Sequence, residues 1–285
     1  MPELPETETI ARDLDAALRG ATVAGVAAPR PDVLREVDAT ALAAGTAGRT
    51  ILRAWRRAKL VVLDLARPTP PGAAHDDVVH LVVQPRFTGA LLIERDGLPA
   101  REAGFTCVTW SLADGRRLHY RDIRRLGTVA LMPPARFAAY TACLGPEPLD
   151  PALTTTAFSG SLRRSRQALK KVLMDQRLLA GVGNIYATEA CWLAGLDPSR
   201  PADSLDDHEA ATLLGALRDV LSRSVAARGT SFRDYVDARG ERGGFVAQLA
   251  AYGRAGAPCA RCGTRLAETM AIDGRTTVFC WRCQR

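Results

Sequence analysis

Four cysteines decide the fold of the C-terminal region: Cys259-Ala260-Arg261-Cys262 and Cys280-Trp281-Arg282-Cys283, which are separated by seventeen residues. Each Cys-x2-Cys knuckle can present two thiolates to one ion, and two knuckles complete a tetrahedral set of four sulfurs that selects zinc. Four protein ligands leave no open coordination position, so the spacing predicts one structural Zn2+ that holds a hairpin in place. Arg275 lies between the knuckles in a Gly-containing turn, where it suits a phosphate or is simply a solvated turn residue.

The chain is basic, and its positive charge is unevenly distributed. Its 38 Lys and Arg exceed its 31 Asp and Glu, which gives a net charge of +7 and favours a polyanionic partner such as nucleic acid. Residues 218–285 hold twelve arginines against six acidic residues, and residues 161–180 hold six basic residues against one acidic residue. Two separated basic regions predict a surface that follows a phosphate backbone.

Other features of the composition exclude several classes of protein. The chain has no run of about eighteen apolar residues, and its acidic N-terminus lacks the features of a secretory signal, so we expect an intracellular protein without a membrane partner. Cys107, Cys143 and Cys191 stand singly in apolar surroundings, which predicts buried thiols.

The N-terminal stretch Met1-Pro2-Glu3-Leu4-Pro5-Glu6 carries a possible nucleophile. If Met1 is removed, Pro2 presents a secondary amine, and an α-amino group titrates near ~8, so a useful fraction is unprotonated at neutral pH. Attack of such an amine on an aldehydic carbon gives an iminium, and Glu3 and Glu6 are placed to move protons around it. The hexapeptide alone is equally typical of the acidic first turn of a helix.

The elements that follow predict an N-terminal helix, a β domain and a helical domain. Residues 6–19 repeat apolar side chains at helical spacing before Gly20, and Ala113-Asp114-Gly115 predicts a hairpin turn. The expected strands lie within Thr50–Ala66, Val78–Glu94, Phe105–Leu112 and Leu118–Met132, which together suggest a sandwich or barrel, and the expected loops are Pro68–Gly72 and Glu94–Gly104. The expected helices are Arg136–Cys143, Leu162–Gln176, Ile185–Ala194 and Leu205–Arg228.

Two helix starts in this second region are predicted from capping residues. Ser204 precedes the last helix as its expected N-cap, and Asn184 is suited to cap the helix after Gly181-Val182-Gly183. Glycines beside free helical N–H groups form a phosphate site or, equally, an ordinary turn between two helices.

With these pieces in order, the chain resembles the formamidopyrimidine-DNA glycosylase/endonuclease VIII family of base-excision repair enzymes. The resemblance rests on the opening hexapeptide, Lys59, Asp122–Gly127, Leu144–Leu149, Asp175–Ala190 and Tyr252–Arg254. It implies an α+β multi-domain fold: a β-sandwich domain with an N-terminal helix (1–133), a linker (134–150), an all-α helix-two-turn-helix domain (151–244) and a zinc-finger hairpin (245–285).

The resemblance also implies a catalytic set. Pro2 would form a Schiff base with C1′ of the damaged nucleotide, expelling the base and then supporting strand cleavage by β- and δ-elimination. Glu3 would handle the deoxyribose ring oxygen and later proton transfers, and Glu6 would assist at the same centre. Lys59 would contact DNA phosphate and help to process the lesion, and Arg275 would belong to both the catalytic and the DNA-binding sets.

A further set would bind DNA. Asn184 and Arg275 would clamp the backbone around a flipped nucleotide, and Tyr186 lies in the same motif as Asn184. Because a base cannot be reached inside the duplex, such an enzyme extrudes the nucleotide and fills the void. Phe87, Arg124 and Leu126 stand at the void-filling positions.

Several residues depart from the pattern of the family. Phe87 replaces the usual methionine and Leu126 the usual phenylalanine, although a strand phenylalanine is commonly just a core residue. Gln84-Pro85 stands where His-Leu is usual and should break the local ladder, and Thr7 replaces a valine. The spacing between the knuckles is one residue longer than is common.

The substrate is indicated by Arg228–Tyr235 and Gly240–Phe245, which resemble the loop that covers an oxidised purine. Glycine content predicts that this loop is mobile. We therefore expect an enzyme that excises 8-oxoguanine and ring-opened purines from double-stranded DNA and also acts at abasic sites. We expect it to be a monomer and to be cytoplasmic and nucleoid-associated. The alternatives are an endonuclease VIII-like enzyme for oxidised pyrimidines, a catalytically silent binder of damaged DNA, and a zinc-ribbon nucleic-acid protein without enzyme ancestry.

Overall fold

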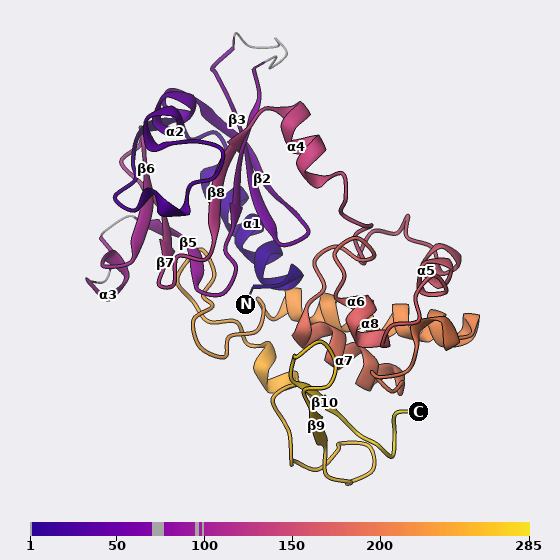
Figure 1. The fold of residues 1–285 in the computed structure, drawn as a ribbon. Coiled ribbons are helices and arrows are strands. Elements are labelled where there is room, and N and C mark those ends of the chain that lie inside the picture. The colour runs from indigo at the N-terminus through magenta and orange to yellow at the C-terminus, as the bar shows by residue number, and fades with distance from the viewer. Residues whose placement is uncertain (1, 70–76, 95–96, 99) are drawn as a thin grey trace. The chain divides into compact units, whose positions relative to one another are not determined.

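The structure is a computed structural model that describes residues 2–69, 77–94, 97–98 and 100–285 (Figure 1). It contains two compact units, one formed by Met1–Ala142 with Arg228–Gly244 and the other by Cys143–Ala227 with Phe245–Arg285. Met1 and residues 70–72 of the predicted Pro68–Gly72 loop lie outside the described residues.

The first unit is a β-sandwich of two antiparallel four-stranded sheets, as predicted (Figure 1). One sheet has the order β1-β6-β7-β5 and the other the order β2-β3-β4-β8. The strands are β1 (Val23–Ala27), β2 (Thr50–Arg57), β3 (Leu60–Ala66), β4 (Val79–Gln84), β5 (Gly89–Glu94), β6 (Thr106–Leu112), β7 (Arg117–Asp122) and β8 (Thr128–Met132).

The helix α1 (Leu4–Leu18) contributes to the main core of this unit. Ile10, Leu14 and Leu18 are fully buried in the cluster that also contains apolar side chains from both sheets. Burial of an apolar helical face at this spacing holds the helix in register. The residues before it, including Pro2 and Glu3, are therefore attached to a rigid element.

Two short helices, one turn and the strand β1 of this unit were not among the predicted elements. α2 (Ala39–Thr46) begins at Asp38, whose side chain accepts a hydrogen bond from the amide of Ala41. The expected loop at 94–104 contains the short helix α3 (Ala100–Ala103). Lys59, which we expected within a strand, lies in the turn between β2 and β3 after Ala58, whose φ is +53°.

The outer face of the second sheet carries a buried polar network on β3. Asp64 accepts hydrogen bonds from Nε1 of Trp55 (2.9 Å), Nδ1 of His80 (2.7 Å) and Nε of Arg53 (2.5 Å). Phe137 of α4 (Pro134–Thr141) covers the network, with its ring centroid 4.8 Å from that of His80. Burial alone would raise the pKa of Asp64, but the hydrogen bonds from His80, Trp55 and Arg53 lower it.

Asp64→Asn should therefore destabilise the protein by about 1–3 kcal/mol at pH 7, because a buried charge-assisted acceptor is lost. Since the folded pKa is lowered, this stabilisation is present above the ordinary carboxyl pKa near ~4 and disappears as the pH falls through the folded value. Denaturant unfolding at pH 7 and at lower pH measures the difference.

The control for this measurement is Glu36→Gln, which removes one partner of the half-exposed Arg136–Glu36 pair. It should change stability by no more than about 0.5 kcal/mol. Equal losses for Asp64→Asn at both pH values would contradict the assignment.

The second unit is helical and ends in a small hairpin, as expected. α8 is twenty residues long, and its apolar face packs against α7 and α5. The elements are α5 (Thr155–Leu162), α6 (Leu169–Leu173), α7 (Asn184–Ala194), α8 (Asp207–Ala226), β9 (Ala267–Thr269) and β10 (Thr277–Phe279). This unit also has 3-10 turns at Ala202–Ser204 and Phe245–Gln248, and the first unit has one at Pro31–Val33.

Three boundaries in this unit differ from the predictions. The helix expected at 162–176 forms only over α6 (Leu169–Leu173), while α5 ends at Leu162. The backbone between them pairs elsewhere, because the amides of Leu169 and Lys170 donate to the carbonyls of Arg200 (2.7 Å) and Pro198 (3.1 Å). The N-cap of α8 is Asp206, which forms a capping box with Glu209, and not Ser204. The N-cap of α7 is Gly183, so Asn184 is the first helical residue.

The segment Arg228–Gly244, which the sequence placed with the helical domain, groups with the sandwich. Tyr235 and Ala238 are buried in the main core, and the amide of Ile93 donates to the carbonyl of Ala238 (3.0 Å). These contacts are inconsistent with a loop that is mobile throughout. None of the described helices has the length and apolarity needed to cross a bilayer.

Candidate active site and nucleic-acid interface

The N-terminal carboxylates of the first unit are buried and organised by the start of α1. Glu3 is the N-cap and Glu6 the third helical residue of a capping box, and Oε2 of Glu6 accepts from the amide of Glu3 at 2.8 Å. Glu3 is 2% exposed and Glu6 is 1% exposed. Pro2 is buried next to them in sequence, so the structure places the predicted nucleophile and both predicted acids at one helix end.

Glu6 also connects the helix to the segment that follows residue 228. Its Oε1 accepts from the amide of Thr230 at 2.8 Å. A Cβ on Gly229 would lie 3.1 Å from the same oxygen, and its φ of +88° further favours glycine. Glu6 therefore orients Glu3 on one side and the 228–244 segment on the other.

The turn that carries Lys59 lies next to the start of α1, which it contacts through Ala58. The Thr7 hydroxyl lies 2.9 Å from the carbonyl of Glu3 and 3.5 Å from that of Ala58, which directly precedes Lys59. Arg56, at the end of β2, donates to Glu8 of α1 (2.9 Å) and to Ala58 (3.0 Å). Arg56 thus fastens the turn that carries Lys59 to α1.

The predicted void-filling residues lie on two loop tips of the sandwich. Phe87, between β4 and β5, is 45% exposed, so it is not a core residue. The guanidinium carbon of Arg124 lies 5.0 Å from the centroid of the Phe87 ring, a cation–π geometry. Leu126, on the same tip as Arg124, is 42% exposed. The structure thus pairs Phe87 with Arg124 and exposes all three side chains.

Asp122, which was not predicted as a functional residue, fastens both tips. It is fully buried and accepts from the Thr88 hydroxyl and from the amides of Arg124 (3.2 Å) and Gly127 (2.8 Å). A Cβ on Gly127 would lie 1.9 Å from the Tyr120 hydroxyl, so only glycine fits there. In the sequence, Asp122 opens the stretch Asp122–Gly127 that carries part of the resemblance, but nothing there indicates that its side chain is buried beneath both tips.

The second unit brings the predicted phosphate residues to one place. Nδ2 of Asn184, at the N-terminus of α7, donates to the carbonyl of Thr276 at 3.1 Å, and Arg275 directly precedes Thr276 in the turn between β9 and β10. Nζ of the fully buried Lys170 donates to the same carbonyl at 2.8 Å. Arg275 is half exposed and lies 3.5 Å from Asp273. Helical N–H groups, an amide and a guanidinium can together receive a phosphate.

Sequence reasoning missed Lys170 and misplaced two other residues. A lysine within an apolar helical stretch gives no sequence signal that its amine is buried on a distant carbonyl. Tyr186 was predicted to bind DNA, but its side chain is fully buried and its hydroxyl bonds that of Ser224 (2.6 Å), so it is a core residue. Cys143 was predicted to be buried and is exposed.

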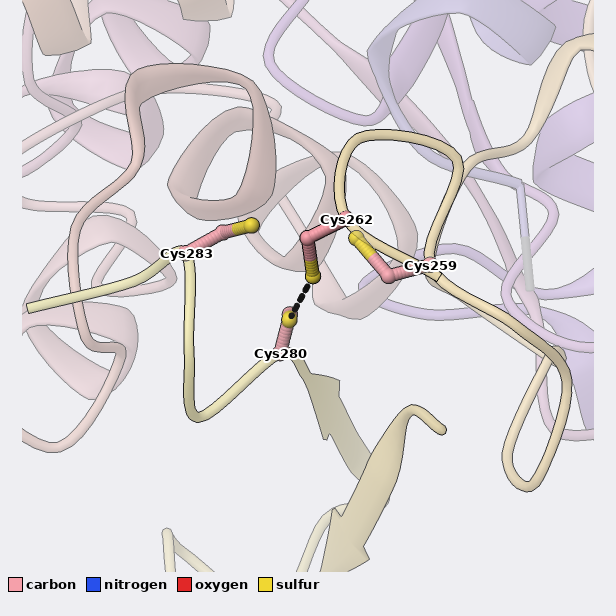
Figure 2. Close-up of side chains that lie close together, drawn as sticks. All are labelled: Cys259, Cys262, Cys280 and Cys283. Atoms are coloured by element: carbon pink, nitrogen blue, oxygen red, sulfur yellow. Dashed lines mark hydrogen bonds between the residues drawn. The ribbon is translucent and has the colours of Figure 1, made fainter. Parts of the chain in front are cut away.

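The four knuckle cysteines converge as predicted (Figure 2). Their sulfur atoms all lie within 4.8 Å of one another, and those of Cys262 and Cys280 are 3.5 Å apart. A tetrahedron of sulfurs bound to zinc at about 2.3 Å has edges of about 3.8 Å, so the cluster fits one ion. Together the cysteines can hold a metal ion.

The surroundings of the cluster fit a structural role. Trp192 of α7 packs against Cys259 and Cys280, and its buried indole N–H faces the sulfur of Cys259, which suits a thiolate there. Gln284 accepts from the amide of Cys280 (2.7 Å) and donates to Leu196 (2.9 Å). The cluster therefore fastens the hairpin to the end of α7.

Comparison with known proteins identifies the family. Residues 1–129 match the family model of the formamidopyrimidine-DNA glycosylase N-terminal domain, and residues 144–236 match that of the formamidopyrimidine-DNA glycosylase H2TH domain. Formamidopyrimidine-DNA glycosylase of Heliobacterium modesticaldum is 40% identical over 290 residues, covering 100% of both chains, and that of Moorella thermoacetica is 43% identical over 268 residues, covering 93% of each.

Solved structures of Fpg proteins also match this chain over nearly its full length. The Fpg protein of Thermus thermophilus is 37% identical with a TM-score of 0.83, covering 99% of this chain and 98% of its own. Fpg of Lactococcus lactis in complex with DNA that contains N7-benzyl-Fapy-dG is 28% identical with a TM-score of 0.88, covering 100% of both chains. The chain belongs to the formamidopyrimidine-DNA glycosylase family.

Proposed function

We propose that the protein is a bifunctional DNA glycosylase and abasic-site lyase of base-excision repair that acts on oxidised or ring-opened purines. The observation that carries the proposal is the helix start at which Pro2, Glu3 and Glu6 meet within one buried site. Relatives that cover the full chain carry the name of such a glycosylase, and related Fpg structures contain Fapy-dG or abasic-site DNA.

In the proposed mechanism, the unprotonated secondary amine of Pro2 attacks C1′ as the bond to the base breaks. The base leaves with the electron pair of that bond and, overall, with the proton that the Pro2 nitrogen loses after the attack. Glu3 donates a proton to the opening deoxyribose ring, and a Schiff base forms between Pro2 and C1′. Loss of a C2′ proton then expels the 3′ phosphate, and a second elimination expels the 5′ phosphate. Lys59 contacts the phosphate, while Glu6 holds Glu3 and the amide of Thr230 in position.

In this proposal, residues of both units bind the DNA. Asn184 and Arg275 grip the backbone, and Phe87, Arg124 and Leu126 fill the void left by an extruded nucleotide. We propose that the cysteine cluster holds one Zn2+, because four thiolates are its preferred structural set. A monomer suffices, since every proposed residue comes from one chain, and the DNA substrate implies an intracellular, nucleoid-associated protein.

The lesion class is tested by excision from otherwise identical duplexes. We expect the protein to remove 8-oxoguanine faster than thymine glycol by roughly 10-fold or more, since a site built for one base leaves polar groups unpaired with another. An undamaged duplex serves as the blank. Preference for thymine glycol would instead support the endonuclease VIII-like alternative, and binding without any excision or lyase activity would support a silent binder.

A further inference from the structure

The segment Arg228–Gly244 is closed at its base by its own backbone. Thr230 pairs with Gly244 in an antiparallel bridge. A Cβ on Gly243 would lie 2.3 Å from the carbonyl oxygen of Gly229, so the two ends of the segment touch where only glycine fits. The tip is different, because Phe232 is 44% exposed and its two successors are also exposed.

Arg228 begins this segment in an unfavourable backbone conformation. Its φ is +63°, in the left-handed region that favours glycine, and Gly229 follows with φ +88°. Non-glycine residues persist there when their surroundings hold them. The side chain of Arg228 supplies that hold.

The guanidinium of Arg228 bridges two buried carboxylates from different elements. Nε donates to Oδ2 of Asp237 at 2.8 Å, and Nη2 donates to the same oxygen and to Oδ2 of Asp13, on α1, at 2.5 Å. The side chains of Asp13 and Asp237 are 4% and 0% exposed. Asp237 also accepts from the amides of Arg239 and Glu241, both at 2.9 Å, and Nη2 of Arg239 lies 3.5 Å from Asp13. Without Arg228, two buried anions would face each other, and only the largely exposed guanidinium of Arg239 would remain near Asp13.

Arg228 lies close in the chain to the residue that contacts Glu6. Thr230, two positions after Arg228, donates its amide to Oε1 of Glu6. The Tyr235 hydroxyl donates to the carbonyl of Arg228 at 3.1 Å. Fixing Arg228 therefore fixes both the Glu6 contact and the base of the exposed tip.

We propose that Arg228, Asp13 and Asp237 form a charge clamp that positions the 230–235 tip for recognition of the damaged base. The proposal rests on the proposed function and deepens it: the three are positioning residues, required for excision of a base and not for cleavage of a site that has already lost its base. The substrate feature that depends on the clamp is thus the purine-derived base itself.

Arg228→Gly tests the clamp without adding backbone strain, because glycine accepts the left-handed conformation while the guanidinium is lost. Under single-turnover conditions, excision of 8-oxoguanine should fall roughly 10- to 100-fold, as expected when a reacting group is misplaced. Cleavage of a preformed abasic site should stay within about twofold of the wild type, because Glu6 keeps its bond to the amide of Glu3 within the capping box of α1. Arg136→Ala, which removes an exposed arginine paired with Glu36, should leave both rates unchanged.

A second variant distinguishes the loss of the Arg228 charge from the loss of its packing. Adding Asp13→Asn to Arg228→Gly removes the repulsion and allows an amide to donate to Asp237, so part of the excision rate should return. Equal loss of both activities in a folded Arg228→Gly protein, or excision at the wild-type rate, would overturn the clamp.

Hydrogen exchange of the free protein supplies a readout that does not require activity. The amides of Thr230, Arg239 and Glu241 should exchange faster in Arg228→Gly than in the wild type, while amides of the sandwich strands should not change. Unchanged exchange at these three amides would refute the clamp whatever the substrate is. Conversely, a wild-type protein that neither excises 8-oxoguanine nor cleaves abasic sites would refute the proposed function while exchange still tests the clamp.

Discussion

A form of the protein with one extra residue linked to Pro2 should give no covalent adduct with abasic-site DNA in the presence of borohydride. The extra residue converts the Pro2 nitrogen from an amine into an amide, whose lone pair is delocalised and cannot attack C1′. The form in which Pro2 is N-terminal, verified by intact mass, should form the adduct in good yield. We expect the difference to reach at least about a thousandfold, because no other group in the proposed mechanism replaces the nucleophile.

The control for this experiment is binding to a duplex with an uncleavable abasic analogue. The added residue should weaken binding far less than it weakens trapping, because Asn184 and Arg275 act at the phosphates. An adduct that persists in the blocked form would show that a side-chain amine, such as that of Lys59, is the nucleophile. Absence of an adduct from the unblocked form would favour a silent binder of damaged DNA.

Loss of the Zn2+ that we propose for the cysteine cluster should strongly weaken DNA binding. β9 and β10 have three residues each, and a two-stranded hairpin of this size is not stable alone. Structural zinc contributes roughly 10–16 kcal/mol to folding in zinc-finger peptides, so Cys280→Ala should unfold the hairpin that presents Arg275. Binding of abasic-analogue DNA should fall by about 100-fold or more, since a phosphate clamp and its positioning are lost together.

Cys143→Ala is the matched control, because Cys143 is exposed and lies outside the cluster. It should retain one zinc per chain by elemental analysis and bind DNA normally. The sandwich should keep its thermal transition in both variants. Loss of zinc without loss of binding would mean that Lys170 and Asn184 alone hold Thr276 and its neighbour Arg275 in place.

The parts of this protein that the sequence predicts are those specified by local spacing. The cysteine knuckles, the apolar period of α1 and the turn at Ala113–Gly115 each depend on residues close in the chain, and each was confirmed. α2 was missed because its eight residues are too few for a clear apolar period. The break after Leu162 is stabilised by main-chain hydrogen bonds to residues 198–203, which are distant in the sequence and give no local signal.

The interactions that could not be predicted join residues far apart in the chain. The Glu6–Thr230 and Asp13–Arg228 contacts span 224 and 215 positions, and nothing in either partner's neighbourhood indicates the other. Tyr186 shows the opposite error, because its place in a motif with Asn184 suggested a shared role. Successive residues of a helix point in different directions, so Asn184 lies at the helix end while Tyr186 points into the core.

The carbonyl oxygen of Thr276 accepts hydrogen bonds from Lys170 and Asn184, and these two bonds determine where the hairpin can change in length. Both donors bind main chain, so they place no demand on the length or composition of the turn that precedes Arg275. An extra residue in that turn can be absorbed while Arg275 stays next in the chain to the held carbonyl of Thr276. Insertions before position 275 should thus be tolerated in natural or engineered variants, whereas an insertion between Arg275 and Thr276 should not.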